Sequence, residues 1–355
     1  MLEPLWFALV AGMLTVYVVL DGFDLGAGAI HLWVARTESE RRQVIASIGP
    51  VWDGNEVWLL AAGGTLFFAF PALYASSFSG FYLPLMIVLW LLMLRGIAIE
   101  FRGHLDSRVW TPFWDAVFCG ASALLAVFFG VALGNVVRGV PLDASGYFFE
   151  PLWTNLRLGP ETGVVDWYTV LVGLTALGAL MLHGSRWVAL KTDGPVRERA
   201  VATARPLWWM TLGLTALLTV ATFGVQPHVP ERLRGQPLGF IFPLLALGGL
   251  FGIRRLSRRG ADLGAFLSSG AYLAGMMSSV AFGLYPYVLP SNADPTHALT
   301  VHGAAAASGG LAIGLTWWIP GMLLAIGYSV FVYRHFAGRV KSGEAGYGHS
   351  GEAPS

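Results

Sequence analysis

The sequence predicts an all-α integral membrane protein with about nine transmembrane helices. Of its 355 residues, 55% are hydrophobic and only 12% are charged, whereas soluble domains usually carry about 25% charged residues. The mean hydropathy is +0.62. A soluble protein of this composition would expose apolar patches much larger than soluble proteins tolerate. Long apolar runs that recur along the whole chain complete the argument.

Nine apolar segments are long enough to cross a bilayer, because about 20 helical residues span its hydrocarbon core. They are 5–33, 52–73, 78–101, 113–137, 165–190, 204–227, 238–255, 261–288 and 312–337. The runs are continuously apolar and lack the alternation of barrel strands, which favours helices over a β-barrel. We therefore expect one polytopic domain, 1–337, and a short, disordered cytoplasmic tail, 338–355.

The basic residues predict the orientation of the chain. Of 22 lysines and arginines, 17 lie in or beside the connections on one side of the predicted spans. The other side has only four: Arg138, Arg157, Arg232 and Arg234. Because cytoplasmic loops carry the excess of basic residues, the N-terminus is expected outside and the C-terminus in the cytoplasm. The net charge of +1 gives no indication of a nucleic-acid partner.

Ionisable residues lie inside the first three predicted spans. They are Asp21 and Asp24, then Asp53 and Glu56, then Arg95 and Glu100. The predicted orientation places all six at a similar depth near the cytoplasmic side. A charge near the middle of a span costs about 2.5–3.5 kcal/mol, so such residues usually have a function. Carboxyl groups gathered on one side suit proton uptake from the cytoplasm.

Each of these residues also has a simpler interpretation. Asp53 could be the N-cap of the second span, after the turn at Pro50. Glu100 could be solvated at the interface, and Trp52 could belong to an aromatic belt. Asp24 and Arg95 lie deeper, and we expect them to neutralise one another.

Metal ligands are poorly represented. His31 and His183 are the histidines near spans, and neither has a second histidine three or four residues away. A lone histidine in that position is weak evidence for haem ligation. The one cysteine, Cys119, gives neither a disulfide framework nor a thiolate metal site.

Several motifs resemble subunit II of the cytochrome bd quinol oxidases. The most specific region is 17–102, which contains Asp21-Gly-Phe-Asp24-Leu-Gly and Trp52-Asp53-Gly-Asn55-Glu56-Val-Trp58. Leu94-Arg95-Gly96 and Ile99-Glu100-Phe101-Arg102 follow in the third span. Glu56 and the Ile99–Arg102 motif are most similar to the cyanide-insensitive branch. The 299–311 region departs from the family pattern, with alanine and glycine where polar residues are usual.

The resemblance implies a fold of nine transmembrane helices, arranged as two four-helix bundles and one peripheral helix. It implies a bacterial plasma (inner) membrane complex that oxidises quinol and reduces dioxygen to water. The partner would be a subunit I that carries haems b and d, with membrane lipids and a small single-span accessory subunit as further candidates. This chain would carry no haem, although a structural quinone is possible.

The resemblance also implies roles for the buried residues, with no catalytic residue on this chain. We assign Asp53, Glu56, Asp24 and Glu100 to a proton route, and Arg95, Asp21 and Trp52 to its structural support.

Two other classes of protein would also explain buried carboxylates. The first is an independent proton-coupled transporter, but such proteins often have two corresponding broken helices. Here only the first span has an acidic, glycine-rich break. The second is a structural membrane partner whose acidic residues merely fix helix packing.

Overall fold

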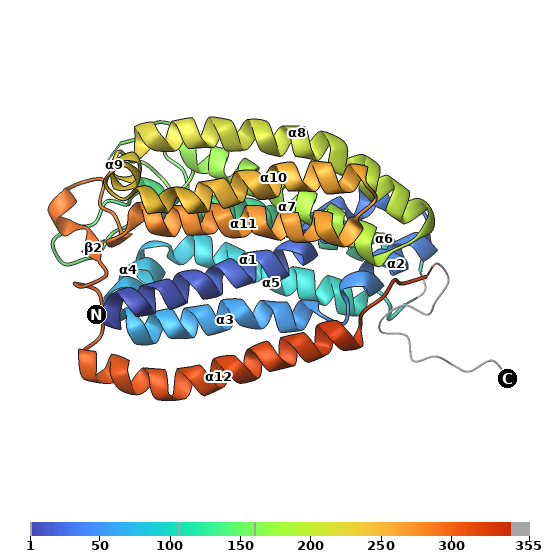
Figure 1. The fold of residues 1–355 in the computed structure, drawn as a ribbon, viewed down its shortest axis with the longest axis horizontal. Coiled ribbons are helices and arrows are strands. Elements are labelled where there is room, and N and C mark those ends of the chain that lie inside the picture. The colour runs from blue at the N-terminus through green and yellow to red at the C-terminus, as the bar shows by residue number, and fades with distance from the viewer. Residues whose placement is uncertain (1, 106, 160, 342–355) are drawn as a thin grey trace.

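The computed structural model describes residues 2–105, 107–159 and 161–341, and this part of the chain is almost entirely helical. The elements, in chain order, are α1 (Leu2–Val34), α2 (Glu38–Ile48), α3 (Trp52–Ala69), α4 (Pro71–Gly80), α5 (Tyr82–Phe101), α6 (Trp110–Arg138), α7 (Trp167–Lys191), α8 (Gly194–Val225), α9 (His228–Gly235), η1 (Pro237–Phe240), α10 (Ile241–Arg258), α11 (Asp262–Leu284), β1 (Tyr287–Leu289), η2 (Pro295–His297), β2 (Leu299–Thr300) and α12 (Ser308–His335). The long helices run along one common direction (Figure 1).

The helices long and apolar enough to cross a membrane agree with the predicted count. Eight of them qualify in the described part of the chain: α1, α5, α6, α7, α8, α10 with η1, α11 and α12. The pair α3 and α4 qualifies together but is bent by 119°. Counting this pair as one span gives nine.

The bend between α3 and α4 corrects two predicted boundaries. The second span was expected to reach residue 73, but α3 ends at Ala69, and α4 starts in a new direction at Pro71. Proline has no backbone N–H to continue the ladder of the preceding helix, whereas it fits the first turn of a new one. The third span, expected from residue 78, begins at Tyr82 because 78–80 belong to α4.

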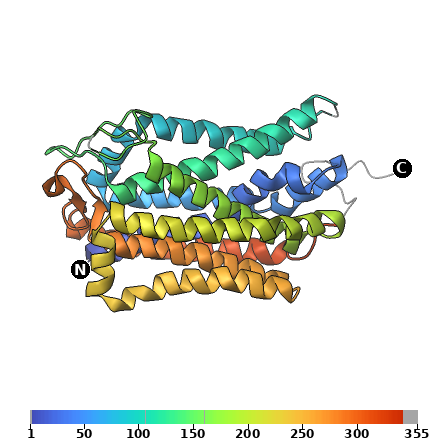
Figure 2. The same ribbon diagram turned by 90° about the horizontal axis from the view of Figure 1, so that it is seen from above.

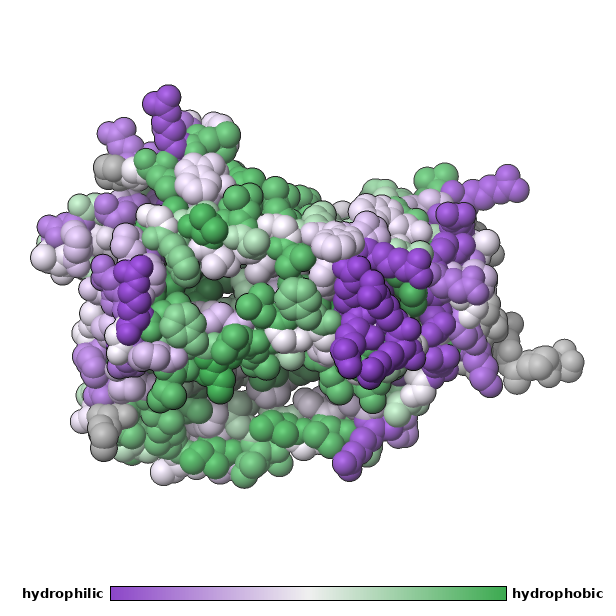
Figure 3. All heavy atoms as spheres, turned by 45° about the horizontal axis from the view of Figure 1, so that its top comes forward, coloured by the Kyte–Doolittle hydropathy of each residue, from purple (hydrophilic) through white to green (hydrophobic). Residues whose placement is uncertain are grey.

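The surface divides into an apolar band and two hydrophilic ends (Figure 3). Large exposed side chains in the band include Leu217 on α8, Leu244 on α10 and Leu324 on α12. A soluble protein rarely exposes so much contiguous apolar surface, whereas a bilayer or a membrane partner covers it. Seen from above, α10 lies at one edge of the molecule and α5 and α6 at the opposite edge (Figure 2).

The first and last long helices place the two ends of the described chain at opposite ends of the molecule. α1 begins at one end of the molecule, and α12 finishes at the other (Figure 1). This agrees with an odd number of crossings, whereas the side that faces the cytoplasm stays a prediction. Of the predicted tail, Val340 is held by a 2.8 Å hydrogen bond from its N–H to the carbonyl of Lys191; 342–355 lie outside the described residues. The division into two bundles and a peripheral helix also stays a prediction.

α1 is central because it packs against α3, α6, α7 and α11. Its backbone touches that of α7 where two glycines meet. A Cβ on Gly26 would lie 1.9 Å from the carbonyl oxygen of Leu180, and one on Gly184 would lie 2.2 Å from the amide nitrogen of Ala27. Small residues permit this close approach between membrane helices.

Gly26→Ala should therefore force α1 and α7 apart. Overpacking typically costs about 1–3 kcal/mol, and here the added carbon meets rigid backbone. We expect a lower yield of intact complex and a lower thermal midpoint, measured on the purified complex. Gly12→Ala on the same helix is the matched control, because no atom lies within 4 Å of its added Cβ. Equal stability of the two variants would contradict the packing argument.

Candidate functional site

A buried ion pair joins α1 to α5. The two terminal nitrogens of Arg95 donate to the two carboxylate oxygens of Asp21, at 3.0 and 2.7 Å. Both side chains are 0% exposed. Two parallel charge-assisted hydrogen bonds fix the relative position and orientation of the two groups.

Glu56 brings α3 into the same cluster. Its Oε1 lies 3.1 Å from Nη2 of Arg95, while its side chain stays 25% exposed. Trp52, one turn earlier on α3, has its ring 5.9 Å from the Arg95 guanidinium. Two carboxylates and an aromatic face thus surround one cation, and the Glu56 carboxyl still reaches the surface of the chain.

The expected pairing of Arg95 with Asp24 is wrong. Residues three apart on a helix point about 60° away from each other, and this angle directs Asp21 to α5 and Asp24 to α3. Asp24 is buried and accepts a 2.7 Å hydrogen bond from the Asn55 side-chain amide. The Tyr333 hydroxyl of α12 donates to the other end of that amide at 2.9 Å. Asp24 is therefore held by a neutral chain of hydrogen bonds.

Two of the proposed proton-route residues lie on the surface of this chain. Asp53 and Glu100 are both exposed, although Asp53 is only one turn from Glu56 on α3. The N-cap interpretation of Asp53 is wrong, because Val51 is the N-cap of α3 and makes no side-chain cap. Glu100 lies one turn beyond Arg95 and faces outward. The structure thus groups Asp21, Glu56, Arg95 and Trp52, with Asp24 beside them.

A second buried cluster, near the α2 end of the molecule, was not predicted. Asp115 of α6 is fully buried and lies 2.9 Å from Nε2 of His31. It also accepts from Arg102 at 2.6 Å and from Arg41 at 3.1 Å. This carboxylate ties α1, α2, α6 and the end of α5 together. In the sequence, Asp115 is visible only as an acidic residue at the start of an apolar run. Its partners could not be predicted from the sequence, because they are 13 to 84 positions away.

A third cluster lies at the other end of α6. Arg138 donates to Glu150 at 2.6 Å and also to Asp166, and all three side chains are buried. The connection between α6 and α7 is therefore anchored to the end of α6. Burial raises the pKa of Glu150 to about 7, although Arg138 acts in the opposite direction.

His183 is a buried structural residue. Its Nδ1 lies 2.6 Å from the hydroxyl of Ser269, and its Nε2 lies 2.9 Å from the carbonyl oxygen of Val19. Within the described residues, no group of three or more His, Cys, Asp or Glu side chains could hold a metal ion.

The fold and its buried ion pairs define a multi-pass helical membrane protein. The chain belongs to the family described as cytochrome bd terminal oxidase subunit II, whose sequence model matches residues 2–336. This confirms the family inferred from the motifs.

Relatives that match nearly the whole chain are named as second subunits of oxidases. A cytochrome bd ubiquinol oxidase subunit 2 from Bacillus subtilis is 32% identical and covers 97% of this chain and 98% of its own. A probable cytochrome oxidase subunit 2 from Haemophilus influenzae is 30% identical, with 96% of this chain and 95% of its own covered. The bd oxidase structure from Geobacillus thermodenitrificans matches the fold with a TM-score of 0.74 at 18% identity, over 94% of this chain and 98% of that chain.

Family membership makes this chain one subunit of a bacterial inner-membrane oxidoreductase, a terminal oxidase of the bd type. A subunit II has a subunit I as its partner, and in this family the haems are carried by that partner.

Removing Arg95 should leave buried carboxylates without their cation. Arg95→Leu is expected to destabilise the complex by about 3–5 kcal/mol, the usual cost of breaking a buried pair. Adding Asp21→Asn should recover part of this loss, whereas adding Asp24→Asn should recover less. Thermal midpoints of the three purified variants measure the difference. Better recovery with Asp24→Asn than with Asp21→Asn would contradict the observed pairing.

Glu150 should make the stability of the complex depend on pH. Its pKa is raised from the ordinary 4.5 to about 7, so between these values the folded state binds a proton that the unfolded state does not. Stability should therefore fall as pH rises from about 4.5 to 7, by at most about 1.4 kcal/mol per pH unit. Glu150→Gln should flatten this slope in thermal-unfolding curves, whereas Glu161→Gln, an exposed residue of the same connection, should not. Equal slopes in both variants would refute the assignment to Glu150.

Proposed function

We propose that this chain is the haem-free subunit of a quinol:oxygen oxidoreductase and supplies its scaffold and its cytoplasmic proton access. In this proposal it pairs with the haem-bearing subunit I. The relatives named as ubiquinol oxidase subunits support a quinol as the electron donor of the complex.

A gradient of burial along one group of carboxyls is the observation that carries the proton-access proposal. Asp53 is exposed, Glu56 on the next turn is 25% exposed, and Asp21 behind Arg95 is fully buried. Carboxyl groups spaced in this way can accept and pass protons between the surface of the chain and its interior. Asp24 and Glu100 are assigned to the edges of the same route.

The surface around Asp53 supports an interface with subunit I in this region. On α3, Asp53 is in line with Val57, Leu60 and Phe67, all of which are exposed. A carboxylate that continues an apolar stripe is costly against lipid. A partner subunit that covers the stripe and leaves water at Asp53 removes this cost. We therefore place subunit I on the face formed by α3 and α5.

The proposed orientation has the α2 end of the molecule in the cytoplasm. Arg41, Arg102, Arg199 and Arg254 lie at or near the helix ends on that side, as the distribution of basic residues in membrane proteins requires. Protons would then enter from the cytoplasm. A structural quinone and a small accessory subunit stay predictions from the sequence.

Asp53→Asn tests the proton route. Loss of a titratable group at the entrance should lower quinol oxidase turnover and charge generation in proteoliposomes by about tenfold or more, a typical effect of losing a positioned proton carrier. Haem content and assembly should stay normal, because asparagine has nearly the same size and shape as aspartate and Asp53 makes no helix cap. Glu198→Gln on α8, an exposed carboxylate near the same end, is the matched control.

Normal turnover and normal charge generation in Asp53→Asn would contradict the proton-route assignment and favour a purely structural role for this subunit. A tagged preparation that stays alone and colourless, without haem bands in a reduced-minus-oxidised spectrum, would instead favour a transporter.

A further inference from the structure

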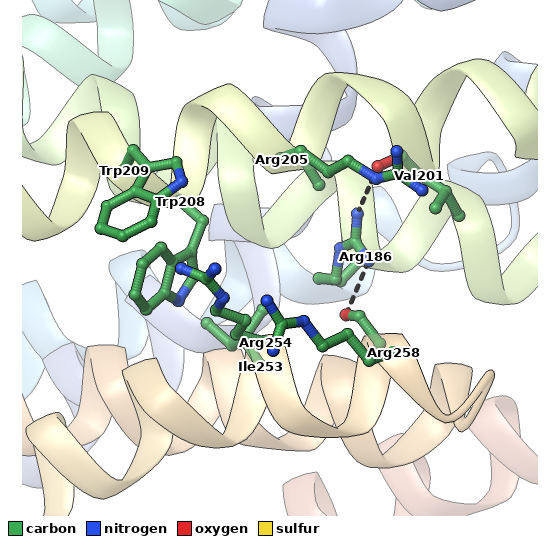
Figure 4. Close-up of a pocket in the computed structure, with 10 residues that line it drawn as sticks. Arg186, Val201, Arg205, Trp208, Trp209, Ile253, Arg254 and Arg258 are labelled. Atoms are coloured by element: carbon green, nitrogen blue, oxygen red, sulfur yellow. Dashed lines mark hydrogen bonds between the residues drawn. The ribbon is translucent and has the colours of Figure 1, made fainter.

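A pocket lined by arginines lies between α8 and α10, away from the cluster at Arg95. Its volume is about 370 Å³, and four of its lining residues are Arg186, Arg205, Arg254 and Arg258. Their guanidinium groups come from three helices and lie in the space between α8 and α10 (Figure 4). We refer to this feature as the arginine pocket.

The positive charge of the arginine pocket is not balanced by acidic residues. No carboxylate lines the pocket, and none forms an ion pair with its four arginines among the described residues. Asp262, on the neighbouring helix, is already bound by Arg197 at 2.9 Å and by Arg339 at 3.1 Å. Four like charges in a partly enclosed, low-dielectric space repel one another, and an anion among them offsets that repulsion.

Arg186 shows that the pocket is built into the fold and is not a chance group of flexible surface side chains. This residue of α7 is 3% exposed. Its Nη1 donates to the Ser257 hydroxyl at 2.9 Å, while Nη2 has only two long contacts of 3.4 Å with backbone carbonyls. Its Nε has no hydrogen-bond partner within the described chain. A buried cation normally has a counter-ion and satisfied donors, so this side chain indicates a missing anionic acceptor.

Two tryptophans fix the position of another pocket arginine. The Arg254 guanidinium lies 4.8 Å from the ring of Trp208 and 4.5 Å from that of Trp209. Trp208 is itself anchored by a 2.6 Å hydrogen bond to the carbonyl of Leu250. Tryptophan prefers the depth where lipid headgroups meet acyl chains. The pocket therefore lies at the depth of a headgroup.

The surface that continues from the arginine pocket towards the membrane centre is apolar. α10 presents Phe251, Leu247 and Leu244 there, all of them exposed, and further along the two helices Phe223 of α8 lines an apolar cavity together with Leu244 and Leu247. An anion with long hydrocarbon chains would contact both the arginines and these side chains. A free inorganic anion would contact only the arginines.

We propose that the arginine pocket binds the phosphate headgroup of an anionic phospholipid whose acyl chains lie along α8 and α10. Arginine suits this role because its planar guanidinium donates two hydrogen bonds to phosphate oxygens. Basic pockets between transmembrane helices on the cytoplasmic side bind anionic headgroups in general.

Native mass spectrometry of the delipidated complex, with both subunits present, tests the proposal. The probes are dioleoyl phosphatidylglycerol, dioleoyl phosphatidylcholine with the same chains, and inorganic phosphate. We expect one tightly held phosphatidylglycerol, weaker phosphatidylcholine and no retained phosphate. Arg254→Gln with Arg258→Gln should weaken phosphatidylglycerol binding at least tenfold.

The matched control is Arg255→Gln with Arg259→Gln. It removes the same charge from the same helix end, but neither residue lines the pocket, and binding should change less than twofold. Equal weakening in both double variants would show a general surface attraction and overturn the proposal. Retention of inorganic phosphate as tightly as the lipid would also overturn it. If the pocket variant does not assemble, Arg258→Gln against Arg259→Gln gives the same comparison at two exposed positions.

Discussion

The Asp21–Arg95 ion pair is fully buried within the chain, and this constrains the helices around it. A guanidinium buried in a membrane protein needs its counter-charge at hydrogen-bond distance, because desolvation costs several kcal/mol per ion. α1 and α5 can satisfy this requirement only in one relative position, and Glu56 adds α3 to it. The contact of Gly26 with α7 then fixes the other side of α1. The centre of the molecule is therefore determined by charge on one side of α1 and by small side chains on the other.

Buried ion pairs between elements also occur at both ends of α6. Asp115 contacts three basic groups near α2, and Arg138 contacts two acids, Glu150 and Asp166, between α6 and α7. Without a hydrophobic driving force between helices in lipid, such polar contacts provide specific attraction. The Asp115 cluster reaches the surface through Arg41 and through Glu38, which pairs with Arg102, and the cluster at Arg95 reaches it through Glu56. The buried Arg138 cluster instead holds the connection between α6 and α7.

The arginine pocket has the opposite charge balance. The other clusters each contain both acids and bases, but the lining residues of this pocket include cations from α7, α8 and α10 and no acid. α8 and α10 make few contacts with each other compared with α10 and α11. A lipid that bridges α8 and α10 would therefore contribute packing that the protein does not supply by itself.

The sequence by itself determined the class, the number of spans and the family. These follow from the length of apolar runs and from local motifs such as Trp52–Trp58, which need no knowledge of distant contacts. It also indicated that Asp21, Asp24 and Arg95 are buried, since they lie within apolar segments, but not that Asp115 is buried or that Asp53 and Glu100 are exposed. Only the tertiary structure decided the partners. Asp21 and Asp24 have different angular positions about the axis of α1, so Asp21 pairs with Arg95 and Asp24 with Asn55. Each residue along a helix turns the side-chain direction by about 100°. The sequence likewise did not predict the arginine pocket. Its arginines are spread over positions 186 to 258 and come together only when α7, α8 and α10 pack.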